Sequence, residues 1–287
     1  MPKVVTGSSA SRRKPKLGQH FLASEGTATR IVEALGDVSQ RTVLEIGPGR
    51  GALTSLLAKR ARRLIAVELD RVLAAQLRMQ FALTPNVEII EADILAVDFN
   101  SLFGPKPGST RPGMELSFEP VRLVGNIPYY LTSDLLLRLF ASHRYFETIV
   151  VMVQREVADR LAAAPGGSDY GLLSATAQLY AKVEKLFTLP ASAFEPSPKV
   201  ESAVVRLTMQ PQVDTLGVHE AAFINFLKLA FGQKRKTLWN NLKLQYDHKA
   251  LRGAMDKAGV KPAVRAEALS LAKSAALFKA LGDGSGG

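Results

Sequence analysis

Four consecutive residues, Asn126-Ile127-Pro128-Tyr129, carry side chains suited to holding a planar nitrogen base. A carboxamide oxygen accepts hydrogen bonds from an exocyclic amine, and an aromatic ring stacks on the face of a base. The apolar run 121–125 comes directly before them, so we expect the tetrapeptide in the loop just beyond a buried strand. Open α/β sheets place their active sites there. Because Asn-x-Pro is also an ordinary turn sequence, the interpretation needs support from the rest of the chain.

A glycine-rich turn upstream predicts a cofactor site. The β-rich run 42–46 breaks into three alternate glycines at 47, 49 and 51, and a helical pattern follows at 52–58. Glycine permits positive φ and a close approach of ligand to backbone, while a helix N-terminus offers unpaired N–H groups. These features indicate a nucleotide-like cofactor. The spacing Gly47-x-Gly49-x-x-Ala52 also fits a dinucleotide-binding turn, so that class stays open at this point.

Carboxylates recur at the ends of three successive predicted strands, at Glu45, Glu68 and Asp93. Glu68 is suited to accept from ribose hydroxyls, as either cofactor class requires. Asp93 is suited to accept from an adenine amine where the next strand passes the base. The three acids together with the glycine turn favour a cofactor that contains ribose and adenine but no pyrophosphate.

The combination resembles the S-adenosylmethionine-dependent methyltransferases. It is most similar to the KsgA-type small-subunit rRNA adenine dimethyltransferases, a family that also includes relatives acting on large-subunit rRNA. The likeness extends from residue 18 to about residue 275. Its motifs, in order, are Gly18-Gln19-His20-Phe21-Leu22, Glu45-Ile46-Gly47-Pro48-Gly49-Arg50-Gly51, Val67-Glu68-Leu69-Asp70, Glu91-Ala92-Asp93, Asn126-Ile127-Pro128-Tyr129, Gln154-Arg155-Glu156-Val157-Ala158 and Phe194-Glu195-Pro196-Ser197-Pro198-Lys199-Val200.

The resemblance implies roles for particular side chains. For the cofactor, it implies that His20 and Leu22 cover it and that Gly47 lies against its methionine part. It also implies that Glu68 holds the ribose, that Asp93 holds the adenine and that Asn126 contacts the cofactor. His20 stands where many relatives have asparagine, and both side chains can donate a hydrogen bond. For the target base, it implies that Asn126 contacts the amine while Tyr129 and Phe194 stack on the two faces. A core position for Phe194, on a proline-rich turn, is the alternative.

Composition limits the class of protein. The chain has 287 residues, of which 47% are hydrophobic, enough for one large domain and a small second one. It contains no cysteine, which excludes disulfides and thiolate metal sites and agrees with a cytoplasmic location. Its four histidines have no ligand spacing, so we expect no metal. No apolar run approaches the roughly 20 residues of a membrane span, and we expect no membrane partner.

The pattern along the chain predicts an α/β fold. We expect a seven-stranded, mostly parallel Rossmann-like sheet because helical stretches alternate with most of the strands. The expected strands are 42–46, 63–67, 87–91, 121–125, 148–154, 181–188 and 202–209. Residues 100–120 are expected to form a long surface loop. The expected organisation is a basic flexible tail at 1–17, a methyltransferase domain at 18–209, a linker at 210–217, a small all-helical domain at 218–281 and a disordered end at 282–287.

Basic residues concentrate in two stretches that contain no acid. The formal net charge is +11, from 37 basic and 26 acidic residues. One stretch is the tail at 1–17, for which a transit peptide is an alternative interpretation. The other is 231–243, where apolar residues at helical spacing predict one RNA-binding helix that presents Lys234, Arg235, Lys236 and Lys243. The alternative for both is a solvated face. We expect Trp239 to be a core anchor rather than a stacking platform.

These observations predict a monomeric enzyme that dimethylates two neighbouring adenosines in a 3′-terminal hairpin loop of small-subunit rRNA, within a pre-ribosomal particle. Methylation of a large-subunit rRNA adenine, as in the antibiotic-resistance relatives, is the alternative among enzymes. A non-catalytic nucleic-acid-binding relative is the alternative from another class, although intact Gly47, Glu68, Asp93 and Asn126 argue against it. A DNA adenine methyltransferase fits less well, because those enzymes usually have two prolines where this chain has Ile127-Pro128.

Overall fold

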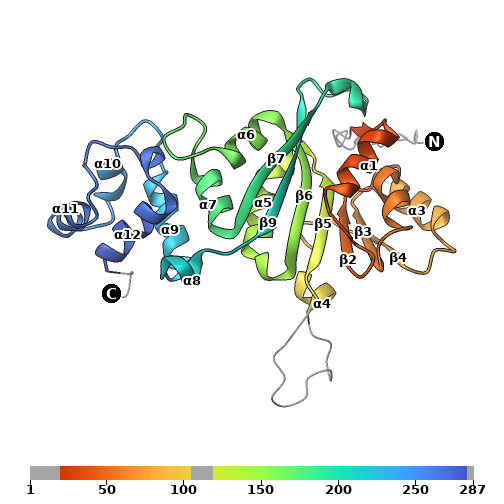
Figure 1. Ribbon diagram of the computed structural model, residues 1–287, viewed down its shortest axis with the longest axis horizontal. Coiled ribbons are helices and arrows are strands. Elements are labelled where there is room, and N and C mark those ends of the chain that lie inside the picture. The colour runs from red at the N-terminus through yellow and green to blue at the C-terminus, as the bar shows by residue number, and fades with distance from the viewer. Residues whose placement is uncertain (1–19, 105–118, 283–287) are drawn as a thin grey trace, which may run out of the picture.

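The computed structural model describes residues 20–104 and 119–282, and its centre is a single twisted sheet (Figure 1). All strands run parallel except β9, which is antiparallel to both of its neighbours. The fold class predicted from the sequence is therefore confirmed. Across the sheet, the seven strands are β4 (Val87–Glu91), β3 (Arg63–Glu68), β2 (Thr42–Ile46), β5 (Val121–Asn126), β6 (Phe146–Gln154), β9 (Ser202–Met209) and β7 (Ala181–Leu189).

Helices cover both faces of this sheet because successive strand residues point to opposite sides. In β2, Val43 belongs to the apolar cluster beneath α1 and α2, whereas Leu44 belongs to the cluster beneath α4, α5 and α7. Each cluster therefore has its own set of alternate strand residues. The helices of this region are α1 (Glu25–Glu33), α2 (Ala52–Leu57), α3 (Arg71–Gln80), α4 (Phe99–Phe103), α5 (Thr132–Ala141), α6 (Arg155–Ala162) and α7 (Leu172–Tyr180).

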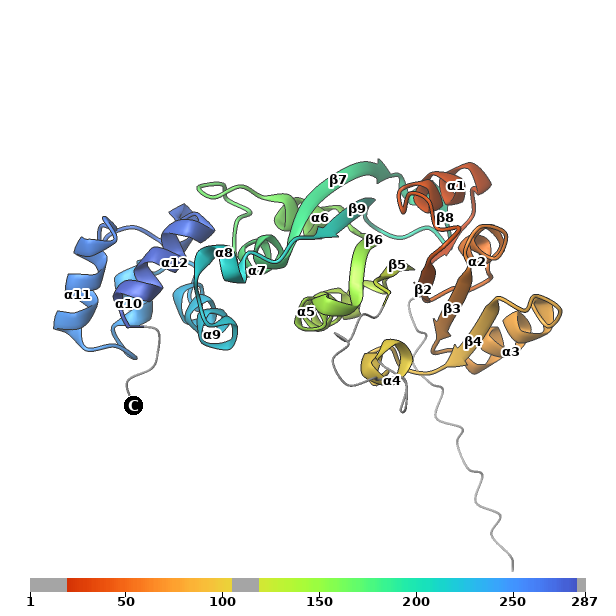
Figure 2. The same ribbon diagram turned by 60° about the horizontal axis from the view of Figure 1, so that its bottom comes forward.

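The C-terminal part is helical, as predicted, and lies at one end of the molecule (Figures 1 and 2). Its apolar residues belong to the same cluster as those of α5 and α7, so one core passes from the sheet into the helices. Polar contacts strengthen the junction: Tyr180 Oη donates to Glu220 Oε1 at 2.7 Å. The helices here are α8 (Val213–Leu216), α9 (Glu220–Ala230), α10 (Leu238–Leu242), α11 (His248–Lys257) and α12 (Leu271–Ala280).

Two segments that were expected to be irregular each contain residues of a short helix. The expected linker at 210–217 contains α8, whose Val213 and Leu216 pack against the core. The expected loop at 100–120 begins inside α4, where Phe99 and Phe103 are buried. In both segments a few apolar side chains gain enough from burial to order a short helix. The predicted tail at 1–17, most of that loop and residues 283–287 lie outside the described residues.

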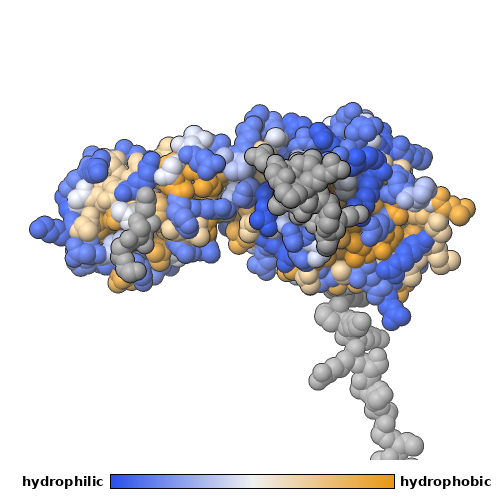
Figure 3. Space-filling model, turned by 90° about the horizontal axis from the view of Figure 1, so that it is seen from below, coloured by the Kyte–Doolittle hydropathy of each residue, from blue (hydrophilic) through white to orange (hydrophobic). Residues whose placement is uncertain are grey.

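The surface is mainly hydrophilic in the space-filling view, with apolar residues at the end that carries α3 (Figure 3). Val72, Met79 and Leu83 are exposed there. In the described part of the chain, no helix is both long and apolar enough to cross a membrane.

Candidate active site

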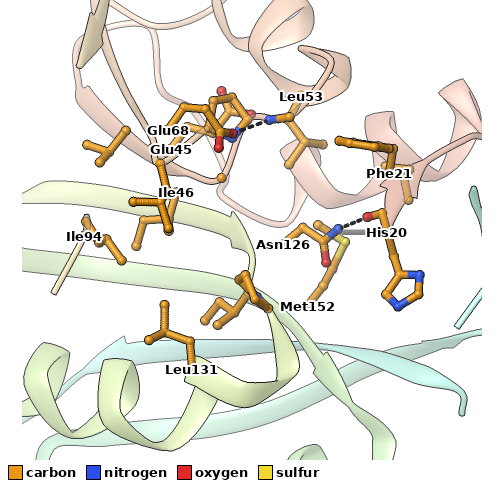
Figure 4. A pocket seen from close by; sticks show the side chains of 18 of the residues that line it. His20, Phe21, Glu45, Ile46, Leu53, Glu68, Ile94, Asn126, Leu131 and Met152 are labelled. Carbon is orange, nitrogen blue, oxygen red and sulfur yellow. Dashed lines mark hydrogen bonds between the residues drawn. The ribbon is translucent and has the colours of Figure 1, made fainter. Parts of the chain in front are cut away.

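One pocket opens at the carboxyl ends of β2, β3 and β5, where the sequence predicted it (Figure 4). Parallel strands bring their carboxyl ends to the same edge, so residues distant in sequence meet there. Of the residues predicted to contact the cofactor or the target base, only Phe194 does not line the pocket. Those that do are His20, Leu22, Gly47, Glu68, Asp93, Asn126 and Tyr129.

The glycine turn forms one wall of the pocket, and glycine is required there for two reasons. Gly47, Gly49 and Gly51 all have positive φ, at 64°, 57° and 83°. In addition, a Cβ atom on Gly49 would lie 2.8 Å from the ring of Phe21, closer than real contacts allow. The turn therefore leaves bare backbone facing the pocket and packs tightly against the segment that covers it.

Glu68, the last residue of β3, accepts a hydrogen bond from the glycine turn. Its side chain is buried, Oε2 accepts from the backbone N–H of Gly49 at 3.0 Å, and Oε1 accepts from the N–H of Asp70 at 2.9 Å. Asp70 in turn caps α3 by accepting from the N–H of Val72 at 2.8 Å. A carboxylate has about four acceptor positions, so Glu68 can also accept from a ligand hydroxyl.

Glu45 is a second carboxyl group of the pocket, and it lies inside β2 rather than at a solvated strand end. Burial, with the nearby negative charge of Glu68, raises its pKa to about 8, although Thr54 opposes the shift. Among the described residues, Glu45 Oε2 and the Thr54 hydroxyl have no hydrogen-bond partner of normal geometry. A buried polar atom without a partner is costly, so Glu45 is suited to meet a polar group of a ligand.

Asn126 is the last residue of β5, not part of the loop beyond it. Its Nδ2 donates to the backbone carbonyl of His20 at 2.6 Å (Figure 4). Tyr129 begins a short 3-10 turn, and its hydroxyl shares a 2.7 Å hydrogen bond with the hydroxyl of Ser202 on β9. Ser202 is buried, so it holds the tyrosine ring at the pocket wall. The sequence did not indicate Ser202, because only the antiparallel packing of β9 beside β6 brings it near.

Asp93 follows β4, which ends at Glu91 and not at Asp93 as predicted. The side chain is exposed at the pocket rim, and its Oδ1 accepts from the N–H of Leu95 at 2.9 Å. This local bond fixes the carboxylate where a ligand amine can reach it.

Phe194 belongs to the short strand β8 (Phe194–Glu195) and is only 3% exposed. Its ring lies in the apolar cluster beneath α1 and α2. In this structure it occupies the core position that the sequence left as the alternative.

The basic stretch at 231–243 does not form one helix, so the prediction of a single helix was wrong. Helix α9 ends at Ala230, a turn follows, and α10 begins only at Leu238, after Thr237 caps its first turn. Within the turn, Lys234 Nζ donates to the carbonyl of Ser168 at 2.9 Å, while Arg235 and Lys236 are exposed. Lys243 caps the C-terminus of α10. The charges thus gather on a turn and at a helix end, and Asn241 Nδ2 donates across this turn to the Ala230 carbonyl at 2.7 Å.

Trp239 is partly buried against the core cluster, in agreement with its expected anchoring role. No group of three or more His, Cys, Asp or Glu side chains within 20–104 and 119–282 is arranged to hold a metal ion.

The sheet order and the pocket define a class. A glycine turn after β2, a carboxylate at the end of β3 and an aromatic-flanked amide at the end of β5 form a Rossmann-like methyltransferase site. A sequence model of the ribosomal RNA adenine dimethylase family matches residues 10–283. The chain belongs to this family, and it is an rRNA adenine dimethylase-type methyltransferase.

Two similar proteins carry names that agree with this family. The chain is 56% identical to the ribosomal RNA small subunit methyltransferase A of Koribacter versatilis, over 99% of this chain and 100% of that one. It is 54% identical to the protein of the same name from Acidobacterium capsulatum, over 96% and 93% of the two chains.

Two solved structures share most of the fold. A dimethyladenosine transferase from Plasmodium falciparum is 26% identical with a TM-score of 0.72, covering 92% of this chain and 99% of that one. The 23S rRNA methyltransferase ErmE is 29% identical with a TM-score of 0.67, covering 91% and 99%.

The raised pKa of Glu45 predicts a pH-dependent stability. The folded protein holds this proton more tightly than the unfolded chain, whose carboxyl has the ordinary value of 4.5. Between pH 4.5 and about 8 the free energy of unfolding should therefore fall as pH rises, by up to about 1.4 kcal/mol per pH unit. Glu45→Gln should remove this contribution, and urea unfolding across the window measures it. The exposed Glu33→Gln serves as the control, and equal pH profiles for both variants would contradict a buried, protonated Glu45.

Proposed function

We propose that this protein transfers methyl groups from S-adenosylmethionine to the exocyclic amines of two adjacent adenosines in a 3′-terminal hairpin loop of small-subunit rRNA during ribosome assembly. One observation carries the proposal: Asn126 and Tyr129 share a pocket with the glycine turn and Glu68. A group that can hold an amine thus lies beside a site suited to a nucleoside-containing methyl donor.

The pocket fits S-adenosylmethionine chemically. Glycine backbone and three carboxyl side chains line it, and these suit a ligand that has hydroxyls, an amine and a positively charged sulfur. Glu68 is assigned to the ribose hydroxyls, Asp93 to the adenine amine and Gly47 to the methionine part, while His20 and Leu22 cover the ligand. When bound, S-adenosylmethionine supplies a strongly activated methyl group.

Asn126 prepares the target nitrogen. The lone pair of the adenine amine is delocalised into the ring, so the nitrogen is a poor nucleophile. With Nδ2 bonded to the carbonyl of His20, the Oδ1 atom of Asn126 is available to accept from the amine. Together with the backbone carbonyl of Ile127, it favours a pyramidal nitrogen whose lone pair faces the methyl group. Because an amide is no general base, the proton leaves after methyl transfer.

Tyr129 is assigned to stack on the adenine, with its ring held by the bond to Ser202. The second stacking surface is assigned to Phe194, whose ring must leave the apolar cluster to reach the base. Base stacking on an aromatic ring stabilises a flipped nucleotide by roughly 1–3 kcal/mol, comparable with the cost of exposing such a ring.

Lys234, Arg235, Lys236 and Lys243 are assigned to the RNA backbone. Three of them are exposed on the turn between α9 and α10, where Lys234 contacts Ser168 in the segment between α6 and α7. Small-subunit rRNA is preferred over large-subunit rRNA as substrate because the relatives at 54% and 56% identity carry the small-subunit name, whereas ErmE is 29% identical.

Mass spectrometry of rRNA tests the substrate. In cells that lack the gene, two dimethyladenosines should be missing from the small-subunit rRNA, and the purified protein with S-adenosylmethionine should restore them. Loss of methyl groups from large-subunit rRNA instead would show that the alternative substrate is correct.

The ribose assignment predicts that Glu68→Ala weakens S-adenosylmethionine binding by roughly 1.5–3 kcal/mol, since a charged acceptor is lost. Isothermal calorimetry measures the affinity. Glu91→Ala, which removes an exposed carboxylate outside the pocket, is the matched control and should bind normally. Equal affinities of the two variants would refute the assignment.

Asn126→Ala should lower methyl transfer by roughly a hundredfold or more, the usual loss when one pre-organised hydrogen-bonding group leaves a reacting centre. RNA affinity should stay unchanged because the amide faces the amine and not the phosphates. Single-turnover assays measure the rate and filter binding measures the affinity. A rate within a few-fold of wild type would exclude the role.

Arg235→Gln with Lys236→Gln should reduce the salt dependence of RNA binding by about two units in the log–log slope if both residues contact phosphate. Their effect on S-adenosylmethionine affinity should be nil, since the cofactor pocket lies elsewhere. Filter binding across a salt series measures the slope. Lys59→Gln with Arg60→Gln removes the same exposed charge near α2 as a control; identical slopes for both pairs would mean that the turn serves only solubility.

A further inference from the structure

His20 connects two parts of the pocket that are far apart in the sequence. Its backbone carbonyl accepts from Asn126 Nδ2 at 2.6 Å, and its ring atom Nδ1 lies 2.6 Å from the carbonyl oxygen of Pro196. Because a carbonyl oxygen can only accept, Nδ1 must carry the hydrogen and donate. The same ring lies beside that of Tyr129, with centroids 5.8 Å apart.

The bond from the His20 ring to Pro196 extends a short two-stranded ladder at a position where the backbone lacks a donor. The strands β1 (Phe21–Leu22) and β8 pair antiparallel, with Phe21 opposite Glu195 and Leu22 opposite Phe194. The next pair in this register is His20 with Pro196. Proline has no N–H, so the backbone pattern stops there. The imidazole supplies the donor that reaches the proline carbonyl and extends the pairing by one residue.

The position of the His20 carbonyl decides how the amide of Asn126 is oriented. With Nδ2 toward that carbonyl, the amide oxygen is directed away from it (Figure 4). The flipped amide would place two oxygen atoms 2.6 Å apart, where they repel each other. The carbonyl thus selects the orientation in which Oδ1 can accept from the target amine.

We propose that His20 is a positioning residue for methyl transfer: its ring, bonded to the Pro196 carbonyl, fixes its own backbone carbonyl, which holds the Asn126 amide with the oxygen toward the target nitrogen. The role rests on the proposed function of Asn126 and adds to it a dependence on the 194–196 segment. His20 acts through Asn126 and not on the substrate amine.

Two amide substitutions of similar polarity test the role. In His20→Asn the amide nitrogen can occupy roughly the place of Nδ1, whereas in His20→Gln it lies one carbon further from the backbone. At saturating S-adenosylmethionine and RNA, kcat of His20→Gln should be about tenfold below that of His20→Asn, the size of one lost hydrogen bond. Equal kcat values for the two variants, or an effect confined to the KM for S-adenosylmethionine, would overturn the proposal.

A double-mutant cycle shows whether the effect passes through Asn126. In an Asn126→Ala background, His20→Gln should cause no further loss of the single-turnover rate, since no amide remains to be oriented. A further tenfold loss would mean that His20 acts independently, and would refute the positioning role.

Failure of the proposed function gives a different result: wild-type protein would then leave small-subunit rRNA unmethylated, whatever residue occupies position 20.

Discussion

The buried carboxylate of Glu68 is the contact on which the geometry of the pocket depends. It accepts from Gly49 in the turn after β2 and from Asp70 at the start of α3, so one side chain sets the spacing between two loops. A buried charge is stable only when such donors satisfy it. The bond from Gly49 also holds the glycine turn in place, which leaves a defined backbone surface for a ligand.

The end of the pocket that we assign to the target base is held by a different set of contacts. The Asn126 amide bonds to the His20 carbonyl, the His20 ring to the Pro196 carbonyl and the Tyr129 hydroxyl to Ser202. Each bond joins segments far apart in the chain. Groups that act on a weak nucleophile must be oriented before reaction, because their reorganisation would otherwise add to the barrier. For the proposed reaction, these contacts supply that orientation.

The helical region is joined to the sheet by a shared core. Besides the continuous apolar cluster, the N–H of Gly166 donates to the Glu267 carbonyl at 2.7 Å, and Lys234 donates to the Ser168 carbonyl. Both bonds connect the segment after α6 with the C-terminal helices. A basic turn held in this way keeps a fixed relation to the pocket, which suits recognition of a structured RNA rather than of an isolated base.

The sequence by itself determined the seven strands, the glycine turn and the meeting of Glu68 with Asn126 at one edge of the sheet, because alternation, glycine spacing and strand-end acids are local patterns. It placed the basic residues of 231–243 on one helix, since spacing cannot reveal that Asn241 Nδ2 bonds to the Ala230 carbonyl across a turn. It also left Phe194 open between core and site. Only the tertiary structure decided the burial of Glu45, the partner of Tyr129 and the orientation of the Asn126 amide, because each depends on which distant strand lies alongside.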